Sequence, residues 1–176
     1  NSFDNKSLAA YSGWAVYAPL DPSRADPLCK GQSPLACELS IVKPSIAIIM
    51  LGTNDVFQPY SVDYYEEGLK TIVYVCISNG VIPVLTTIPF IIGRDVTPYN
   101  AAIIRVARNN DIPLIDYFTA MEGAPNHGLG ADGVHPSTPP FGPTATFTPD
   151  GLQYGYTLRN LITLQMLDAL WRKALY

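Results

Sequence analysis

Apolar residues along the chain gather in short runs that lack the regular polar alternation of a half-exposed strand. Three such runs, bounded by turn-forming residues, cover Ser45–Leu51, Val81–Ile88 and Ile112–Tyr117. Runs of this kind are typical of strands in a parallel sheet that is covered on both faces. A weaker run, Phe3–Ala9, predicts one more strand near the start of the chain.

Segments of helical length and apolar spacing lie between and after these strands. They cover Val62–Asn79, Tyr99–Asn110 and Tyr156–Leu175. The last is amphipathic, and its predicted buried side carries Leu158, Leu161, Ile162, Leu164, Leu167, Trp171 and Ala174. Strands that alternate with helices predict an α/β fold with a mainly parallel sheet. At 176 residues, we expect a single domain spanning 1–176.

Two stretches fit no regular element and are expected to be surface excursions, at 19–34 and 136–149. Five of the fourteen residues in the second stretch are proline. Proline at this density excludes a helix or a central strand.

Charge and hydropathy exclude two classes of partner. The chain has 11 basic and 15 acidic residues, a net charge of -4, and no basic cluster that would bind nucleic acid or anionic lipid. Its longest apolar runs, Ile46–Leu51 and Ile72–Ile77, are too short to cross a bilayer, so we expect a soluble chain with no transmembrane segment. The chain begins at Asn1 instead of Met, and we expect a leader or longer segment upstream.

The three cysteines fall into two environments. Cys29 and Cys37 bracket a turn-rich segment and predict a local disulfide, which implies an extracellular, cell-surface or periplasmic location. Two free thiols in a cytosolic loop are the alternative. Cys76 lies in an apolar periodic run and is expected to be a buried small hydrophobe. With only two histidines in the chain, we expect no metal site.

Two short motifs carry residues suited to ligand binding and to general base catalysis. The run Gly52-Thr53-Asn54-Asp55 follows the strand at Ser45–Leu51, and so places an amide at the carboxyl edge of the sheet, where such folds bind ligands. Asp132 precedes His135 by three residues, a spacing that lets the carboxylate hold one ring nitrogen and leave the other as a general base. A surface histidine in a turn and a turn-forming Asn are the structural alternatives. Asp55 is expected to brace its turn.

These residues resemble the SGNH hydrolases, the GDSL-type esterases and lipases. The sequence IIMLGTNDV is similar to the third block of the family, DGVHPS to the fifth, and SLAAYSGW, less closely, to the second. The run GVIPVLTTIPF resembles the fourth strand of these proteins. The resemblance implies a flavodoxin-like three-layer α/β/α sandwich and hydrolysis of carboxylic or carbohydrate acyl esters without a cofactor.

Residue by residue, the resemblance makes His135 the general base and Asp132 its orienting carboxylate. It makes Asn54 and the backbone N–H of Gly13 the oxyanion donors. A plain turn glycine is the alternative reading of Gly13.

One block of the family is absent from these 176 residues: the Gly-Asp-Ser that supplies the nucleophilic serine at the end of the first strand. Neither Ser12 nor Ser137 matches its motif or position. We therefore expect an upstream segment or a second chain to supply a serine-bearing strand between Phe3–Ala9 and Ser45–Leu51. The rival hypothesis is a non-catalytic binding or assembly module that retains the fold.

Other polar and aromatic residues leave both functional and structural roles open. His127, between Asn126 and Gly128, is expected to be a loop residue or a contact at a pocket rim. Five tyrosines near the motifs could rim a pocket or pack in the core: Tyr60, Tyr64, Tyr65, Tyr154 and Tyr156.

Overall fold

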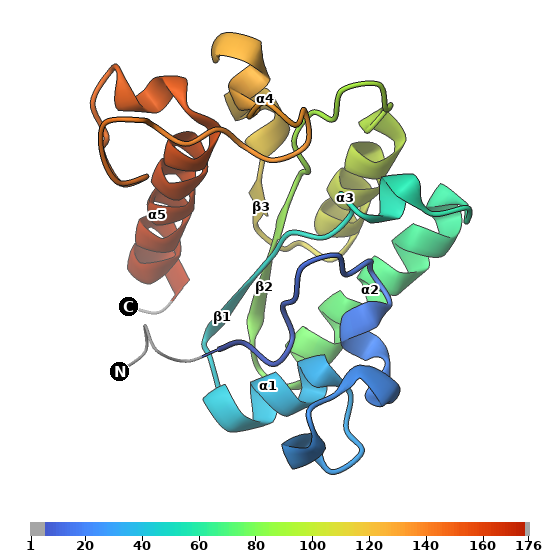
Figure 1. The fold of residues 1–176 in the computed structure, drawn as a ribbon. Coiled ribbons are helices and arrows are strands. Elements are labelled where there is room, and N and C mark those ends of the chain that lie inside the picture. Colours follow the sequence, from blue (N-terminus) through green and yellow to red (C-terminus); the bar gives the residue numbers. More distant parts are fainter. Residues whose placement is uncertain (1–5, 175–176) are drawn as a thin grey trace. The chain divides into compact units, whose positions relative to one another are not determined.

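The computed structural model describes residues 6–174 of the chain (Figure 1). They form two compact units, one of residues up to Leu85 together with Thr97–Leu114, the other of Thr86–Val96 together with residues from Ile115 onward. Each unit is described by itself below. The single domain expected from the chain length remains a prediction.

A small parallel sheet carries the three stronger predicted strands. β1 is Ile46–Ile49, β2 is Ile82–Thr86 and β3 is Leu114–Ile115, in the order β1-β2-β3. β1 and β2 run parallel, with Ile46 opposite Ile82. The predicted α/β class with a parallel sheet is thus confirmed.

The strand expected at Phe3–Ala9 is not formed by the residues that the structure describes. Phe3 lies outside the described residues, and Lys6–Ala9 has no strand structure. One reason is local: the backbone N–H of Leu8 donates to the side-chain carboxylate of Glu38 and so is not part of a ladder.

Three helices belong to the first unit: α1 (Pro34–Val42), α2 (Val62–Ser78) and α3 (Thr97–Asn109). Ser61 caps α2 by accepting from the N–H of Tyr64, and Ser33 caps α1 in the same way. α2 and α3 pack side by side (Figure 1). Their buried apolar faces carry Tyr65, Leu69, Ile72, Val73, Cys76, Ala102, Ile103 and Val106. α2 and α3 confirm the predicted helices, whereas α1 was not expected.

The second unit contains α4 (Tyr117–Met121) and α5 (Gly155–Ala174). α5 confirms the predicted final helix, but the buried side assigned to it is wrong in part. Leu164 and Trp171 are 52% and 56% exposed, and Leu170 is the large apolar residue of α5 that is buried. The contacts of α5 within its unit involve α4 and two short 3-10 helices. Leu158, Leu161, Ile162 and Leu167 are half-buried.

The two predicted excursions differ in their structure. Within 19–34 lie 3-10 turns that begin at prolines, including Pro22–Arg24 and Pro27–Cys29, whose N–H groups are capped by Asp21 and Asp26. The predicted disulfide joins Cys29 to Cys37, and Cys76 is buried and free. The stretch 136–149 consists of turns and irregular backbone, as its prolines predict.

None of the helices described has the length and apolar character of a membrane-spanning segment.

Candidate active site

Asn54 stands just beyond the carboxyl end of β1, at the start of a 3-10 turn over Asp55–Phe57. Its side-chain Nδ2 donates to the backbone carbonyl of Trp14 at 3.0 Å. This bond ties the loop after β1 to a segment forty residues earlier and fixes the orientation of the amide. The second N–H of the same amide remains for a ligand.

Gly13 lies next to this tie, in the exposed loop before Val16. Its φ is +80°, a conformation that favours glycine, and a Cβ added there would meet nothing within 4 Å. The requirement for glycine is therefore conformational, and the backbone around Gly13 lies open to a substrate. The structure thus brings the Gly13–Trp14 segment and Asn54 together.

Asp55 is fully buried and bonds to residues of both the Val16 segment and the loop after β1. Its carboxylate accepts the N–H of Val16 at 3.0 Å and 3.2 Å, and the hydroxyl of Tyr60 at 2.5 Å. Burial raises the pKa of Asp55, while the bonds from Tyr60 and Val16 act in the opposite direction. Asp55 therefore braces more than its own turn, because it links the Val16 segment to the loop after β1.

Asp132 and His135 form a close pair in the second unit. The Oδ2 of Asp132 lies 2.7 Å from Nδ1 of His135, and its Oδ1 accepts the backbone N–H groups of Val134 and His135 at 3.0 Å and 2.9 Å. These bonds lower the pKa of Asp132 to about 2, and the bond from the Val134 N–H contributes most. The ionised carboxylate holds a proton on Nδ1, which leaves Nε2 as the basic nitrogen.

The loop that carries this pair is pinned at several points within its unit. Gly130 N–H donates to the His135 carbonyl at 2.8 Å, and Ile92 N–H to the Gly133 carbonyl at 2.9 Å. Gly133 has φ +69°, and a Cβ there would meet Ile92 at 2.8 Å, so both conformation and space require glycine. The side chain of His135 is 70% exposed on this rigid loop.

Ser137 follows the pair and has a structural part in the loop. Its hydroxyl donates to the Gly128 carbonyl at 3.0 Å and accepts the Gly155 N–H at 3.1 Å, which joins the loop to the start of α5. The proton and one lone pair of this hydroxyl are therefore engaged in holding the loop. This agrees with the mismatch between Ser137 and the nucleophile motif.

Sequence reasoning missed most of the residues that line a pocket beside Gly13. Tyr60 and Tyr64, named as possible rim residues, do line it, together with Trp14, Tyr17 and Arg24. Tyr65 is fully buried and donates to the Leu51 carbonyl at 2.9 Å, so its role is packing. The feature of the sequence that pointed to this pocket was the group of tyrosines that follows Asn54.

The remaining candidates lie in the second unit. His127 is an exposed loop residue whose ring stacks on Phe90 at 4.1 Å. Tyr154 packs edge-on against Phe141 at 5.7 Å.

The parallel sheet, the amide at the end of β1 and the Asp132–His135 pair are the features in which the sequence resembles the SGNH hydrolases. The profile of the GDSL-like lipase/acylhydrolase family matches residues 2–139, and the chain belongs to this family. A search of curated protein sequences found no match.

Solved structures share the fold at low sequence identity. A GDSL-like lipase from Bacteroides thetaiotaomicron is 22% identical with a TM-score of 0.64, over 90% of this chain and 73% of that chain. An acetylxylan esterase from Geobacillus stearothermophilus is 19% identical with a TM-score of 0.60, over 88% and 68%. An esterase from a Pseudoalteromonas species is 18% identical with a TM-score of 0.57, over 92% and 73%. At these identities the likeness supports the fold alone.

Proposed function

We propose that this chain belongs to a serine hydrolase of acyl esters, with carboxylic esters and acylated carbohydrates as its substrates. The observation that carries the proposal is the His135–Asp132 contact of 2.7 Å, with the carboxylate ionised and the imidazole exposed. Membership of the acylhydrolase family supports the same chemistry.

In the proposed reaction, Nε2 of His135 removes the proton from a serine hydroxyl as its oxygen attacks the ester carbonyl carbon. The carbonyl oxygen becomes an oxyanion, which the Gly13 N–H and the free N–H of Asn54 stabilise. The intermediate collapses to an acyl-enzyme, and His135 gives its proton to the departing alcohol. A water molecule, deprotonated by His135, then attacks the acyl carbon. Collapse of this second intermediate releases the acid, and His135 returns the proton to the serine oxygen. No metal or cofactor takes part.

The serine itself is proposed to come from a strand supplied by an upstream segment or a second chain. The support is the contrast between two neighbouring strands. Val84 and Leu85 in β2 are 0% and 1% exposed, whereas Ile48 in β1 is 40% exposed. In the part of the chain that the structure describes, β1 pairs with β2 alone, so its other edge is open to a further strand.

Two histidines in the chain offer a matched test of the catalytic proposal. In the complete protein, His135→Ala is expected to lower the rate of p-nitrophenyl acetate hydrolysis by at least ~10³-fold, since loss of a triad member has this scale. His127→Ala removes an exposed imidazole of the same unit and is expected to retain the rate. Equal rates in the two variants would reject the assignment.

A non-catalytic binding module that retains the fold is the second candidate. The residue at the nucleophile position of the added strand decides between the two. Serine there supports the hydrolase, and any other residue supports the module.

An extracytoplasmic setting is proposed on the basis of the Cys29–Cys37 disulfide. Alkylation of the native, unreduced protein is expected to label none of the three cysteines of this chain. Cys76 is 0% exposed, and burial raises the pKa of its thiol to about 11. Unfolding without reductant should expose Cys76 alone, as mapped by peptide mass spectrometry. Labelling of Cys29 or Cys37 before reduction would remove the argument.

A further inference from the structure

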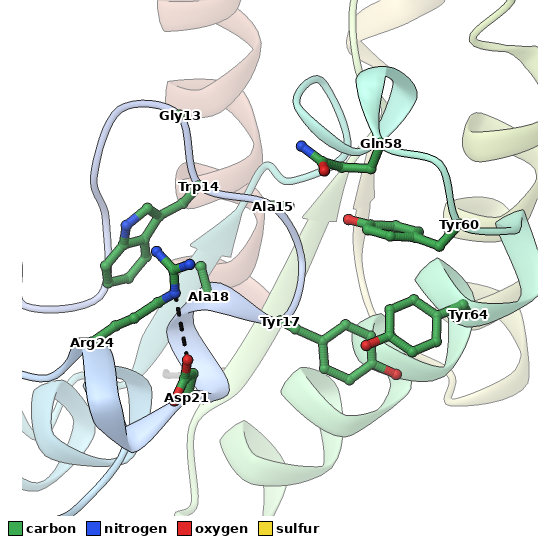
Figure 2. A pocket seen from close by; sticks show the side chains of 10 residues that line it. All are labelled: Gly13, Trp14, Ala15, Tyr17, Ala18, Asp21, Arg24, Gln58, Tyr60 and Tyr64. Atoms are coloured by element: carbon green, nitrogen blue, oxygen red, sulfur yellow. Dashed lines mark ion pairs between the residues drawn. The ribbon is translucent and has the colours of Figure 1, made fainter.

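A pocket of about 290 Å³ lies in the first unit, directly beside Gly13 (Figure 2). Trp14 and Arg24 stand on one side of it, and Tyr60 and Tyr64 on the other. Its volume is at the lower end of the ~300–1,000 Å³ that small-molecule sites occupy. The pocket therefore has room for a single ring and little more.

The aromatic side of the pocket is held rigid by contacts among tyrosines. The Tyr64 ring lies 4.4 Å from that of Tyr17 and 4.9 Å from that of Tyr60. Tyr60 is fixed in turn by its hydroxyl, which donates to the buried Asp55. On the opposite side Trp14 packs against Tyr11 at 4.8 Å. Ring faces carry partial negative charge and attract the polarised C–H groups of a ligand.

The polar groups of the pocket carry no net charge. Arg24 pairs with Asp21 at 3.5 Å, and Gln58 contributes an uncharged amide. Hydrogen bonds from Ser23, with a smaller contribution from Arg24, lower the pKa of Asp21, so its carboxylate stays ionised. Together these groups offer both charge-assisted donors and acceptors, a set that matches hydroxyl groups.

We propose that this pocket binds one neutral, polyhydroxylated ring, the sugar that forms the alcohol part of the ester. An acyl chain offers no hydrogen-bonding groups to the Asp21–Arg24 pair or to Gln58, and a phosphate would face the carboxylate of Asp21. A sugar ring stacks on the tyrosines and bonds to the polar groups at the same time. The identity of the substrate, though not the binding itself, rests on the proposed function.

The position of the pocket connects it to the proposed chemistry. Gly13 is part of the lining, and the carbonyl of Trp14 accepts the Asn54 amide. A ring held against Trp14 therefore lies next to Gly13, one of the two proposed oxyanion donors, and Trp14 itself bonds to the other, Asn54. An acyl group on one of the hydroxyls of the ring would extend toward this segment. The pocket would thus select the alcohol of the ester.

Binding is tested without turnover in the complete protein carrying His135→Ala. Saturation-transfer NMR with methyl glucoside is expected to show binding that Tyr64→Ala weakens roughly tenfold, since removal of a packed aromatic anchor has this scale. Tyr64→Phe keeps the ring and should keep binding. Tyr74→Ala removes a tyrosine of the same helix that is 71% exposed and serves as the matched control. Binding of octanoate or inorganic phosphate in place of the glucoside, or equal binding by all variants, would overturn the proposal.

Kinetics on the active protein separate this proposal from the catalytic one. Tyr64→Ala is expected to raise KM for 6-O-acetylglucose about tenfold while leaving KM for methyl acetate, whose alcohol part has no ring, unchanged. An equal effect on both substrates would reject the sugar site. A complete lack of p-nitrophenyl acetate hydrolysis in the otherwise unsubstituted protein would reject the hydrolase and leave the NMR result as the test of the pocket.

Discussion

Asp132 bonds to both the backbone and the side chain of His135 through its two carboxylate oxygens. One oxygen closes the turn and the other holds the imidazole. A single carboxylate therefore sets the position of the ring and also the nitrogen that carries its proton.

Substitution of this carboxylate has a predictable effect on rate. Asp132→Asn is expected to lower kcat in the complete protein by about 10³–10⁴-fold, because the amide stabilises the wrong tautomer of His135. Asp150→Asn, which changes an exposed carboxylate of the same unit, should leave kcat unchanged. Steady-state kinetics on the two variants measures the difference, and a similar kcat in both would contradict the assigned role.

The pH dependence of this pair follows from the pKa of Asp132. Its folded value of about 2 lies below the ordinary 3.8. The contribution of these contacts to the free energy of unfolding is therefore present above pH 3.8 and is lost as the pH falls through 3.8 to 2. Carbon-detected NMR titration of Asp132 should show no ionisation change above pH 3.8. A midpoint above that value would contradict the geometry.

In the proposed mechanism, Asn54 acts on charge that develops during the reaction. Asn54→Ala is therefore expected to lower kcat by about 10²–10³-fold while changing KM little. Asn79→Ala removes another amide that bonds a backbone carbonyl in the first unit, at 2.8 Å, and provides the control. A rise in KM at constant kcat would show that Asn54 binds substrate and is no oxyanion donor.

At the scale of elements, α2 contains a glycine in its middle for a steric reason. A Cβ at Gly68 would lie 2.9 Å from both Tyr17 and Val16, and Val16 is fully buried. Helix propensity alone favours alanine by about 1 kcal/mol, so the close approach of the Val16 segment decides the residue.

Gly68→Ala is expected to lower the free energy of unfolding by about 1–3 kcal/mol, because Val16 is packed too tightly to yield. Gly123→Ala, where an added Cβ would meet nothing within 4 Å, is the control and should have little effect. Urea unfolding of the complete protein measures both. A stabilised Gly68→Ala variant would show that propensity prevails over packing here.

The elements that the sequence predicted are those with a strong periodic pattern. β2 carries an apolar run and α2 an apolar face of several turns, and burial follows both. β1 carries an apolar run as well, although its Ile48 is 40% exposed. α1 was missed because it begins at Pro34, directly after a turn-rich segment, and ends in the exposed Ile41 and Val42. Its boundaries therefore carry no clear apolar signal.

The same contrast applies to the candidate site. The Asp132–His135 pair could be predicted because all its contacts lie within one short turn. The pocket could not, because Trp14 and Tyr64 are brought together by the tie between Val16 and Asp55. No local pattern in the sequence predicts a contact between residues that are so far apart along the chain.

At the scale of the whole molecule, the exposure of Ile48 in β1 predicts that an added strand buries this residue in the complete protein. Ile48→Ala is expected to lower the free energy of unfolding by about 2–4 kcal/mol there, as for a buried isoleucine. Ile77→Ala makes the same change at a residue of α2 that is 48% exposed, and should stay within about 0.5 kcal/mol. Urea titration distinguishes them. Equal small effects would mean that no strand covers β1.

The side chains of His135 and Asn54 are held by contacts of different range along the chain, and so differ in how easily they are disturbed. The acid–base pair depends on a handful of bonds between Gly130 and Ser137, whereas the Asn54 amide is oriented by a carbonyl forty residues away. Mild denaturation or truncation that loosens the Trp14 segment would disorient the amide and leave the imidazole paired with its carboxylate. A damaged molecule of this kind would keep the contact between Asp132 and His135 but would lose the oriented amide that is proposed to stabilise the oxyanion. The state of the histidine is therefore a poor reporter of a competent site, and the Asn54–Trp14 contact is the better one.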